Sequence, residues 1–173
     1  MTEGQDRVED GEELYRRVRD QTPAGQLCFQ NIAGRVVFSQ AAFNDPQKRP
    51  SVDRAKLSGN NPHPARVSRD DGIVALQADA IRQIALNRHG QAQTMHSVNV
   101  IPNPVEGNPA HAVIVTDPAA TSGIFKRLKE ALARLATEAG WRVEPGVPIL
   151  RPKFLATIHD AFRWIIGFVR RVK

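Results

Sequence analysis

The sequence has little cysteine and few large aromatics: one Cys, one Tyr and two Trp among 173 residues. The single cysteine, Cys28, can form neither a disulfide within the chain nor a thiolate zinc site, which is typical of a reducing compartment. The glycines form neither GxGxxG nor GxxxxGK[ST], and the histidines form no HExxH pair. We therefore expect no metal site and no bound cofactor, and no motif identifies a reaction.

Long hydrophobic runs are also missing. The first 18 residues are acidic and polar, without the apolar centre of a signal peptide. In the C-terminal segment the longest uncharged run is Trp164–Val169, and a transmembrane helix needs about 20 apolar residues. The sequence thus predicts a cytoplasmic protein.

Charge is present in excess, and it is localised. The formal net charge is +6; residues 124–173 carry 11 Lys/Arg against 4 Asp/Glu, a net charge of +7, whereas residues 1–123 carry 13 against 14. No basic patch is interleaved with aromatics that could stack on bases, so nucleic-acid binding is not expected. A basic end favours contact with an anionic surface or an acidic partner.

Apolar and β-branched runs predict strands. Residues 27–43 read as a hairpin that turns at Gly34, and residues 72–77, 96–104 and 111–118 as further strands. Residues 12–20 fit either a short helix or a first strand. Residues 44–72 hold four prolines and no periodicity, which predicts a long loop.

Two helices are predicted upstream of residue 141. One covers residues 78–90. The clearer one covers residues 121–140, where Thr121 or Ser122 can cap the start and Gly140 the end. Its apolar stripe consists of Phe125, Leu128, Leu132, Leu135 and Ala136.

The expected fold class is α+β: a small, mostly antiparallel sheet with two or three helices, followed by a C-terminal amphipathic helix. The expected organisation is a flexible acidic leader at 1–13, the α+β domain at 14–140, a Pro-rich joint at 141–152 and a basic helix at 153–173.

The expected C-terminal helix has a continuous apolar seam with four–three spacing. The residues proposed for interaction are Phe154, Ile158, Phe162, Trp164, Ile165, Phe168 and Val169, with Arg163, Arg170 and Arg171 as cations. Three interpretations stay open. The helix packs on its own domain, binds a protein partner or another copy, or lies on an anionic membrane surface such as the inner face of the cell membrane.

Four polar residues are candidates for a chemical site. His96 and His111 each open a predicted strand, so they can meet at one end of a sheet as proton-transfer groups; the alternative is that both bond to backbone. Arg16 and Arg17 carry guanidinium groups, which bind phosphate or carboxylate through two parallel bonds. Cys28, between Leu27 and Phe29, is expected in the core.

Four segments carry a resemblance: Leu14–Arg17 (LYRR), Ser39–Phe43 (with one extra alanine), Ser51–Asp53 (SVD) and Pro109–Ala112 (PAHA). Together they resemble a family of small bacterial proteins that has no assigned activity. The resemblance covers about residues 14–116 and implies a bacterial origin and a shared small fold. It implies no reaction.

A second similarity is to small ADP-ribosyltransferase-like domains, and it rests on the early Leu-Tyr-Arg, the following hairpin and the Ser-Val-Asp segment. In such domains an early arginine binds a dinucleotide. The sequence departs from that pattern because it lacks the glutamate or tyrosine pair used at later positions.

Two functional hypotheses follow. The first is an interaction protein whose segment 153–173 engages a partner, a second copy or an anionic membrane. The alternative is a small enzyme for a nucleotide-type substrate, with Arg16 or Arg17 in binding and His96 or His111 in proton transfer. A concave pocket that gathers Arg16, His96 and His111 would favour the enzyme.

Overall fold

The computed structural model describes residues 7–86 and 95–147, and it confirms the α+β class. A five-stranded sheet has the order β5-β1-β4-β7-β6, with every neighbouring pair antiparallel. Its strands are β1 (Glu13–Val18), β4 (Ser51–Arg54), β5 (Gly72–Gln77), β6 (Ser97–Pro102) and β7 (His111–Asp117). The remaining elements are the hairpin strands β2 (Phe29–Ile32) and β3 (Arg35–Phe38), the helices α1 (Ala78–Arg82) and α2 (Ser122–Ala139), and the 3₁₀ turns η1 (Gln40–Phe43), η2 (Ala55–Ser58) and η3 (His63–Ala65).

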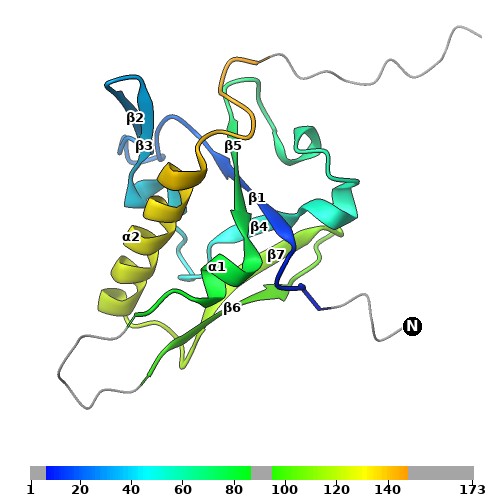
Figure 1. Ribbon diagram of the computed structural model, residues 1–173, viewed down its shortest axis with the longest axis vertical. Coiled ribbons are helices and arrows are strands. Elements are labelled where there is room, and N and C mark those ends of the chain that lie inside the picture. Colours follow the sequence, from blue (N-terminus) through cyan, green and yellow to red (C-terminus); the bar gives the residue numbers. More distant parts are fainter. Residues whose placement is uncertain (1–6, 87–94, 148–173) are drawn as a thin grey trace, which may run out of the picture.

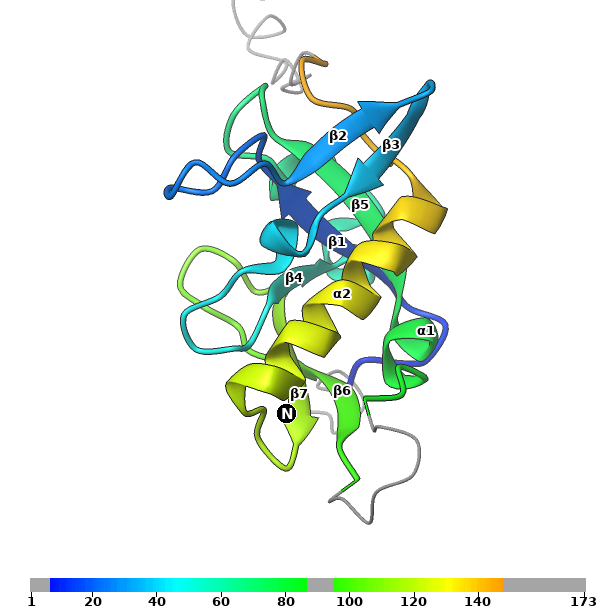
Figure 2. The ribbon, with the colours of Figure 1, turned by 90° about the vertical axis from the view of Figure 1, so that its left-hand side faces the viewer.

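Helix α2 covers one face of the five-stranded sheet (Figures 1 and 2). Its predicted apolar stripe packs there, with Leu135 partly buried and the other four residues buried. The core that it forms with the sheet includes Leu14, Val74 and Ile114. The Thr121 hydroxyl accepts a hydrogen bond from the Ile124 amide, which satisfies one of the free N–H groups at the helix start. The predicted cap and stripe are thus confirmed.

The β2–β3 hairpin stands beyond the end of the sheet and turns at Ala33–Gly34, both with positive φ. A two-residue turn of this kind suits the twist of an antiparallel pair. Trp141 attaches the hairpin to the rest of the molecule, because its ring packs edge-on against Phe29 and Phe38.

Two sequence predictions were wrong in their extent. Residues 44–72 are not a structureless loop, since they contain β4, the central strand of the sheet. Helix α1 ends at Arg82, well short of the predicted residue 90. The proposed interaction helix, 153–173, lies outside the described residues. Within 7–86 and 95–147, no helix combines the length and the apolar character needed to span a bilayer.

The sheet splits between β1 and β4. Strand β1 pairs with β5 along its whole length, but with β4 only at Leu14–Arg54 and Tyr15–Asp53. At the paired end the buried Arg54 guanidinium donates to both carboxylate oxygens of Glu12, at 2.8 and 3.0 Å. From Arg16 onward the two strands diverge, and a cavity lies at this opening.

Candidate functional site

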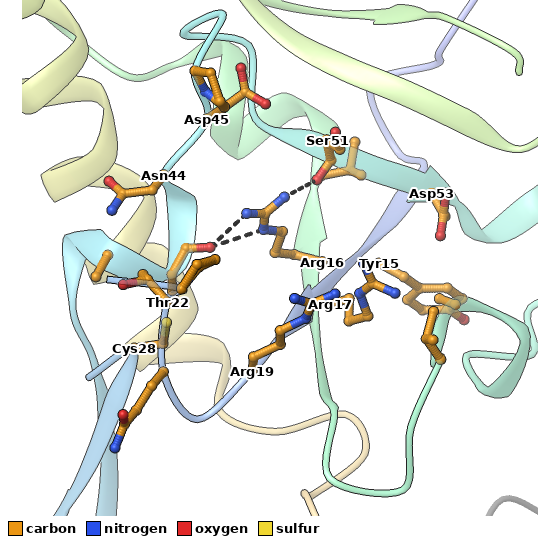
Figure 3. Close-up of a pocket in the computed structure, with 18 of the residues that line it drawn as sticks. Tyr15, Arg16, Arg17, Arg19, Thr22, Cys28, Asn44, Asp45, Ser51 and Asp53 are labelled. Atoms are coloured by element: carbon orange, nitrogen blue, oxygen red, sulfur yellow. Dashed lines mark hydrogen bonds between the residues drawn. The ribbon is translucent and has the colours of Figure 1, made fainter. Parts of the chain in front are cut away.

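The cavity has a volume of about 860 Å³. It is lined by the second half of β1 and the loop after it, by η1 and the loop that follows, and by β4, the start of β7 and the turn before it. Side chains alternate between the two faces of a strand, so the opening exposes residues from both faces of the sheet. Figure 3 shows this region with most of the lining residues as sticks.

Arg16 lies in the opening and joins its two sides (Figure 3). Its Nε and Nη2 donate to the carbonyl oxygen of Ala42 at 3.1 and 2.7 Å, and its Nη1 donates to the carbonyl oxygen of Ser51 at 2.7 Å. The guanidinium carbon also sits 5.5 Å from the centre of the Phe43 ring. A guanidinium has five N–H donors, so one N–H on each Nη stays available.

The surroundings of Arg16 disfavour its positive charge. Its pKa is lowered from the ordinary value to about 10, mainly by burial; Asp45 acts in the opposite direction, and the neighbouring positive charge of Arg17 adds to the lowering. Removing a cation from water disfavours its charged form unless an anion is close. The site therefore favours an additional negative charge beside Arg16.

Two more arginines extend this cationic end. Arg17 is half-buried and lines the cavity, and no residue that the structure describes accepts a hydrogen bond from its side chain or forms an ion pair with it. Arg19 is exposed and approaches the carboxylate of Asp71 only to 4.0 Å. The cationic end, Arg16, Arg17 and Arg19, thus holds more positive charge than its surroundings neutralise.

A second polar group lies across the sheet from β1. Strand pairing places Tyr15 opposite Asp53 and Asp53 opposite His111, in one row across β1, β4 and β7. Asn108 fixes the middle of this row: its Oδ1 accepts from the Ala110 amide at 3.1 Å and its Nδ2 donates to Asp53 Oδ1 at 2.8 Å. We call Asp53, Asn108 and His111 the acceptor end of the cavity.

The hydrogen bonds of His111 determine which ring nitrogen carries the proton. Nδ1 lies 2.6 Å from the carbonyl oxygen of Asn103, and a carbonyl can only accept, so Nδ1 must donate. Nε2 is then the lone-pair nitrogen of the neutral ring. No residue in the described ranges 7–86 and 95–147 bonds to it.

Tyr15 and Cys28 also line the cavity but are not activated. The pKa of the Tyr15 hydroxyl is raised, mainly by burial and further by Glu13. Burial likewise raises the pKa of the Cys28 thiol, which Arg16 only partly offsets. Both groups therefore stay protonated at neutral pH, and Cys28 has the core position that the sequence predicted.

The cavity brings together three of the four candidates from the sequence, Arg16, Arg17 and His111. His96 is elsewhere: it precedes β6, and its Nδ1 lies 2.9 Å from the carbonyl oxygen of Pro118. Because β6 and β7 are antiparallel, the start of β6 pairs with the end of β7. The two histidines therefore lie about 20 Å apart along the strands. They do not meet in one site, and each contacts a backbone carbonyl oxygen, as the alternative interpretation of the sequence had it.

Asp53 and Asn108 were not among the predicted site residues. Asn108 carries no sequence signal beyond a turn-forming dipeptide, but Asp53 belongs to the Ser-Val-Asp segment. The LYRR, SVD and PAHA segments lie on or beside the adjacent strands β1, β4 and β7 and all contribute to the cavity. Their side-by-side position depends on the strand order, which sequence spacing alone does not reveal.

In the described part of the chain, no group of three or more His, Cys, Asp or Glu side chains is arranged to hold a metal ion. The proposed interaction residues from Phe154 to Arg171 lie outside that part. Comparisons with protein-family models, with curated proteins and with solved structures give no match.

Proposed function

We propose that this protein binds a small anionic ligand, of the phosphate type, in the cavity between β1 and β4. The observation that carries the proposal is the pair of guanidinium groups at its cationic end. Arg17 has no partner among the described residues, and Arg16 keeps two free N–H donors.

Electrostatics supports an anion at this position. Burial and the charge of Arg17 together lower the pKa of Arg16 to about 10, and a bound anion offsets both effects. A hydrogen bond between charged groups contributes about 1.5–3 kcal/mol, and planar guanidinium groups match phosphate oxygens in pairs. Several such bonds together are enough for specific binding.

The size of the cavity supports a ligand larger than phosphate itself. Its volume of about 860 Å³ falls in the range of small-molecule sites, roughly 300–1,000 Å³. A nucleotide-type ligand fits this range, in agreement with the substrate class of the enzyme hypothesis. His111 places its imidazole in the same cavity, and imidazole is the side chain used most often for proton transfer.

Calorimetric titration with inorganic phosphate and pyrophosphate tests the proposal. We expect Arg17→Gln to weaken binding about 10- to 100-fold, because it removes a charged donor from the site. Arg35→Gln is the matched control, since Arg35 is exposed on β3, outside the cavity, and its loss changes the net charge equally. Equal affinities of the two variants, or no binding by the wild type, would contradict the proposal.

The interaction hypothesis for residues 153–173 stays a prediction beside this proposal. Its support is the charge distribution, because six Lys/Arg and one Asp follow Val147. The two hypotheses are compatible, since a ligand-binding domain can be carried by a segment that binds a partner or a membrane.

A further inference from the structure

An anion bound to the arginines does not contact the acceptor end of the cavity. Asp53 offers its second carboxylate oxygen, Oδ2, and His111 offers Nε2; neither atom bonds to a residue of the described ranges. Both atoms accept hydrogen bonds and neither donates. A partner at this end must therefore carry hydrogen-bond donors.

The bonds around these acceptors hold them in place. The Ala110 amide fixes the orientation of the Asn108 side-chain amide, and that amide holds Asp53 Oδ1. The Asn103 carbonyl fixes the protonated nitrogen of His111. Because Asp53 and His111 are directly paired residues of β4 and β7, the two acceptors lie side by side on one face of the sheet.

Charge decides which donors suit this end. The cavity is lined by three arginines and two aspartates, so its net charge is positive with His111 as a hydrogen-bond acceptor. An ammonium group would be repelled by the arginines, whereas neutral hydroxyl groups would not. Two adjacent hydroxyls match two adjacent acceptors.

The two ends are separated by the length of a small sugar phosphate. Arg17 lies two residues beyond Tyr15 on β1, and Tyr15 is paired with Asp53. Regular strand geometry would put the Cα atoms of Arg17 and Asp53 roughly 8 Å apart, and the divergence of β1 from β4 beyond Tyr15 adds to this distance. Inorganic phosphate contacts one end at a time, while a phosphorylated sugar reaches both.

We propose that the ligand is a phosphorylated sugar or nucleotide, whose phosphate binds Arg16 and Arg17 and whose vicinal hydroxyls donate to Asp53 and His111. This inference rests on the proposed function and adds the chemical class of the ligand. It makes Asp53 the residue that distinguishes a sugar phosphate from a bare anion.

Titration of the full-length chain with three probes tests the inference: inorganic phosphate, ribose 5-phosphate and phosphoethanolamine. We expect ribose 5-phosphate to bind at least about tenfold more tightly than phosphate, because two further hydrogen bonds form. Phosphoethanolamine should gain nothing over phosphate. Asp53→Asn should remove the gain of ribose 5-phosphate over phosphate without weakening phosphate binding, since it removes a negative charge from the cavity while the asparagine side chain keeps the shape and can still accept from Asn108.

Two controls keep the result interpretable. Asp70→Asn makes the same change of charge at an exposed residue outside the cavity and should have no effect. 2-Deoxyribose 5-phosphate lacks one hydroxyl and should lose affinity on the wild-type protein, which tests the inference even if Asp53→Asn fails to fold.

The outcomes separate the two proposals. If phosphate binds but ribose 5-phosphate binds no more tightly, or if Asp53→Asn keeps the gain, the inference is wrong and the anion site stands. A tighter complex with phosphoethanolamine also overturns it, in favour of an amine at Asp53. If the wild type binds no probe, both proposals fail.

Discussion

At the scale of single residues, Arg16 has two roles that depend on the same guanidinium group. Three of its N–H donors hold the backbone of Ala42 and Ser51, and its charge contributes to the anion site. The structural role requires a planar group with donors in several directions, which a lysine ammonium does not supply. An experiment can therefore distinguish the two arginines, because a substitution of Arg16 should change stability as well as anion binding.

We expect Arg16→Lys to lower the free energy of unfolding by about 1–3 kcal/mol, because at least one carbonyl at the opening loses its donor. Urea denaturation measures this change. The exposed Arg35 provides the control, as Arg35→Lys should leave stability within about 0.5 kcal/mol of the wild type. If Arg16→Lys had the same free energy of unfolding as the wild type, the hydrogen bonds of Arg16 would not be what holds β1 and β4 at the opening.

The reactivity of the Cys28 thiol measures how far this side chain is buried beside the cavity. Because burial raises its pKa, less thiolate is present at each pH than in an ordinary thiol of pKa about 8.5. We expect alkylation of the folded protein to level off at a higher pH than alkylation of the urea-unfolded chain. The unfolded chain ionises first, so the same shift makes folding less favourable as the pH rises above the ordinary thiol pKa.

Rates of iodoacetamide labelling between pH 7 and 10 measure this difference. Identical pH profiles of the folded and unfolded chain would contradict it.

At the scale of elements, prediction from sequence succeeded where the hydrophobic pattern decides structure. Strands β5, β6 and β7, the hairpin and α2 all have continuous apolar or periodic sequence bounded by Gly, Pro or a capping hydroxyl. Strand β4 was missed because Ser-Val-Asp-Arg has one apolar residue and follows Pro50. Its strand conformation comes from pairing with β1 and β7 on both sides, which a local pattern does not encode.

The same reason explains the candidate site. The arginines and His111 were identified as residue types with suitable chemistry, but their meeting requires β4 between β1 and β7. Antiparallel pairing also separates His96 from His111, although both residues open strand-like runs.

The contact between Trp141 and Gly72, the first residue of β5, gives a prediction for stability. A Cβ atom on Gly72 would lie 2.3 Å from the Trp141 ring, and that ring is already packed against Phe29 and Phe38. We expect Gly72→Ala to destabilise the fold by about 1–3 kcal/mol through overpacking, with loss of the hairpin contacts. Thermal unfolding followed by Trp fluorescence measures it.

Gly123→Ala is the matched control. No atom lies within 4 Å of a Cβ at Gly123, in the first turn of α2, and alanine is the better helix former by about 1 kcal/mol. Its stability should equal or exceed that of the wild type. A Gly72→Ala protein as stable as this control would mean that Trp141 moves freely.

At the scale of the whole molecule, charge divides the chain unequally. Residues 1–123 are almost neutral, and the excess positive charge belongs to residues 124–173. The cationic end of the cavity is thus a local arrangement within a near-neutral part of the chain. Long-range attraction of anions comes from residues 124–173. Added salt should therefore weaken binding to an anionic surface through these residues more than it weakens binding of a small anion in the cavity, because buried charges are screened less.

Sedimentation with vesicles tests the C-terminal prediction. If residues 153–173 lie on membranes, the full-length chain should pellet with anionic vesicles and not with neutral ones, at roughly 1 kcal/mol for each Lys or Arg near the surface. A chain ending at Val147 should stay in the supernatant with both. A full-length variant with Arg163, Arg170 and Arg171 changed to Gln controls for truncation and should bind more weakly.

Absence of sedimentation in every sample would exclude the membrane interpretation. Size-exclusion chromatography of the same samples then distinguishes a self-association helix, which gives a larger assembly only with the segment present, from a helix that completes the core.

The split between β1 and β4 has a consequence for how affinity can be changed. The arginines belong to the β5–β1 pair, whereas Asp53 and His111 belong to the group β4–β7–β6. A ligand held at both ends therefore bridges two groups of strands that are joined only by the short β1–β4 pairing. The distance that it must span is set by how α2 and η1 space these groups. Substitutions where α2 packs against β5 can therefore change which ligands bind without altering a residue that lines the cavity.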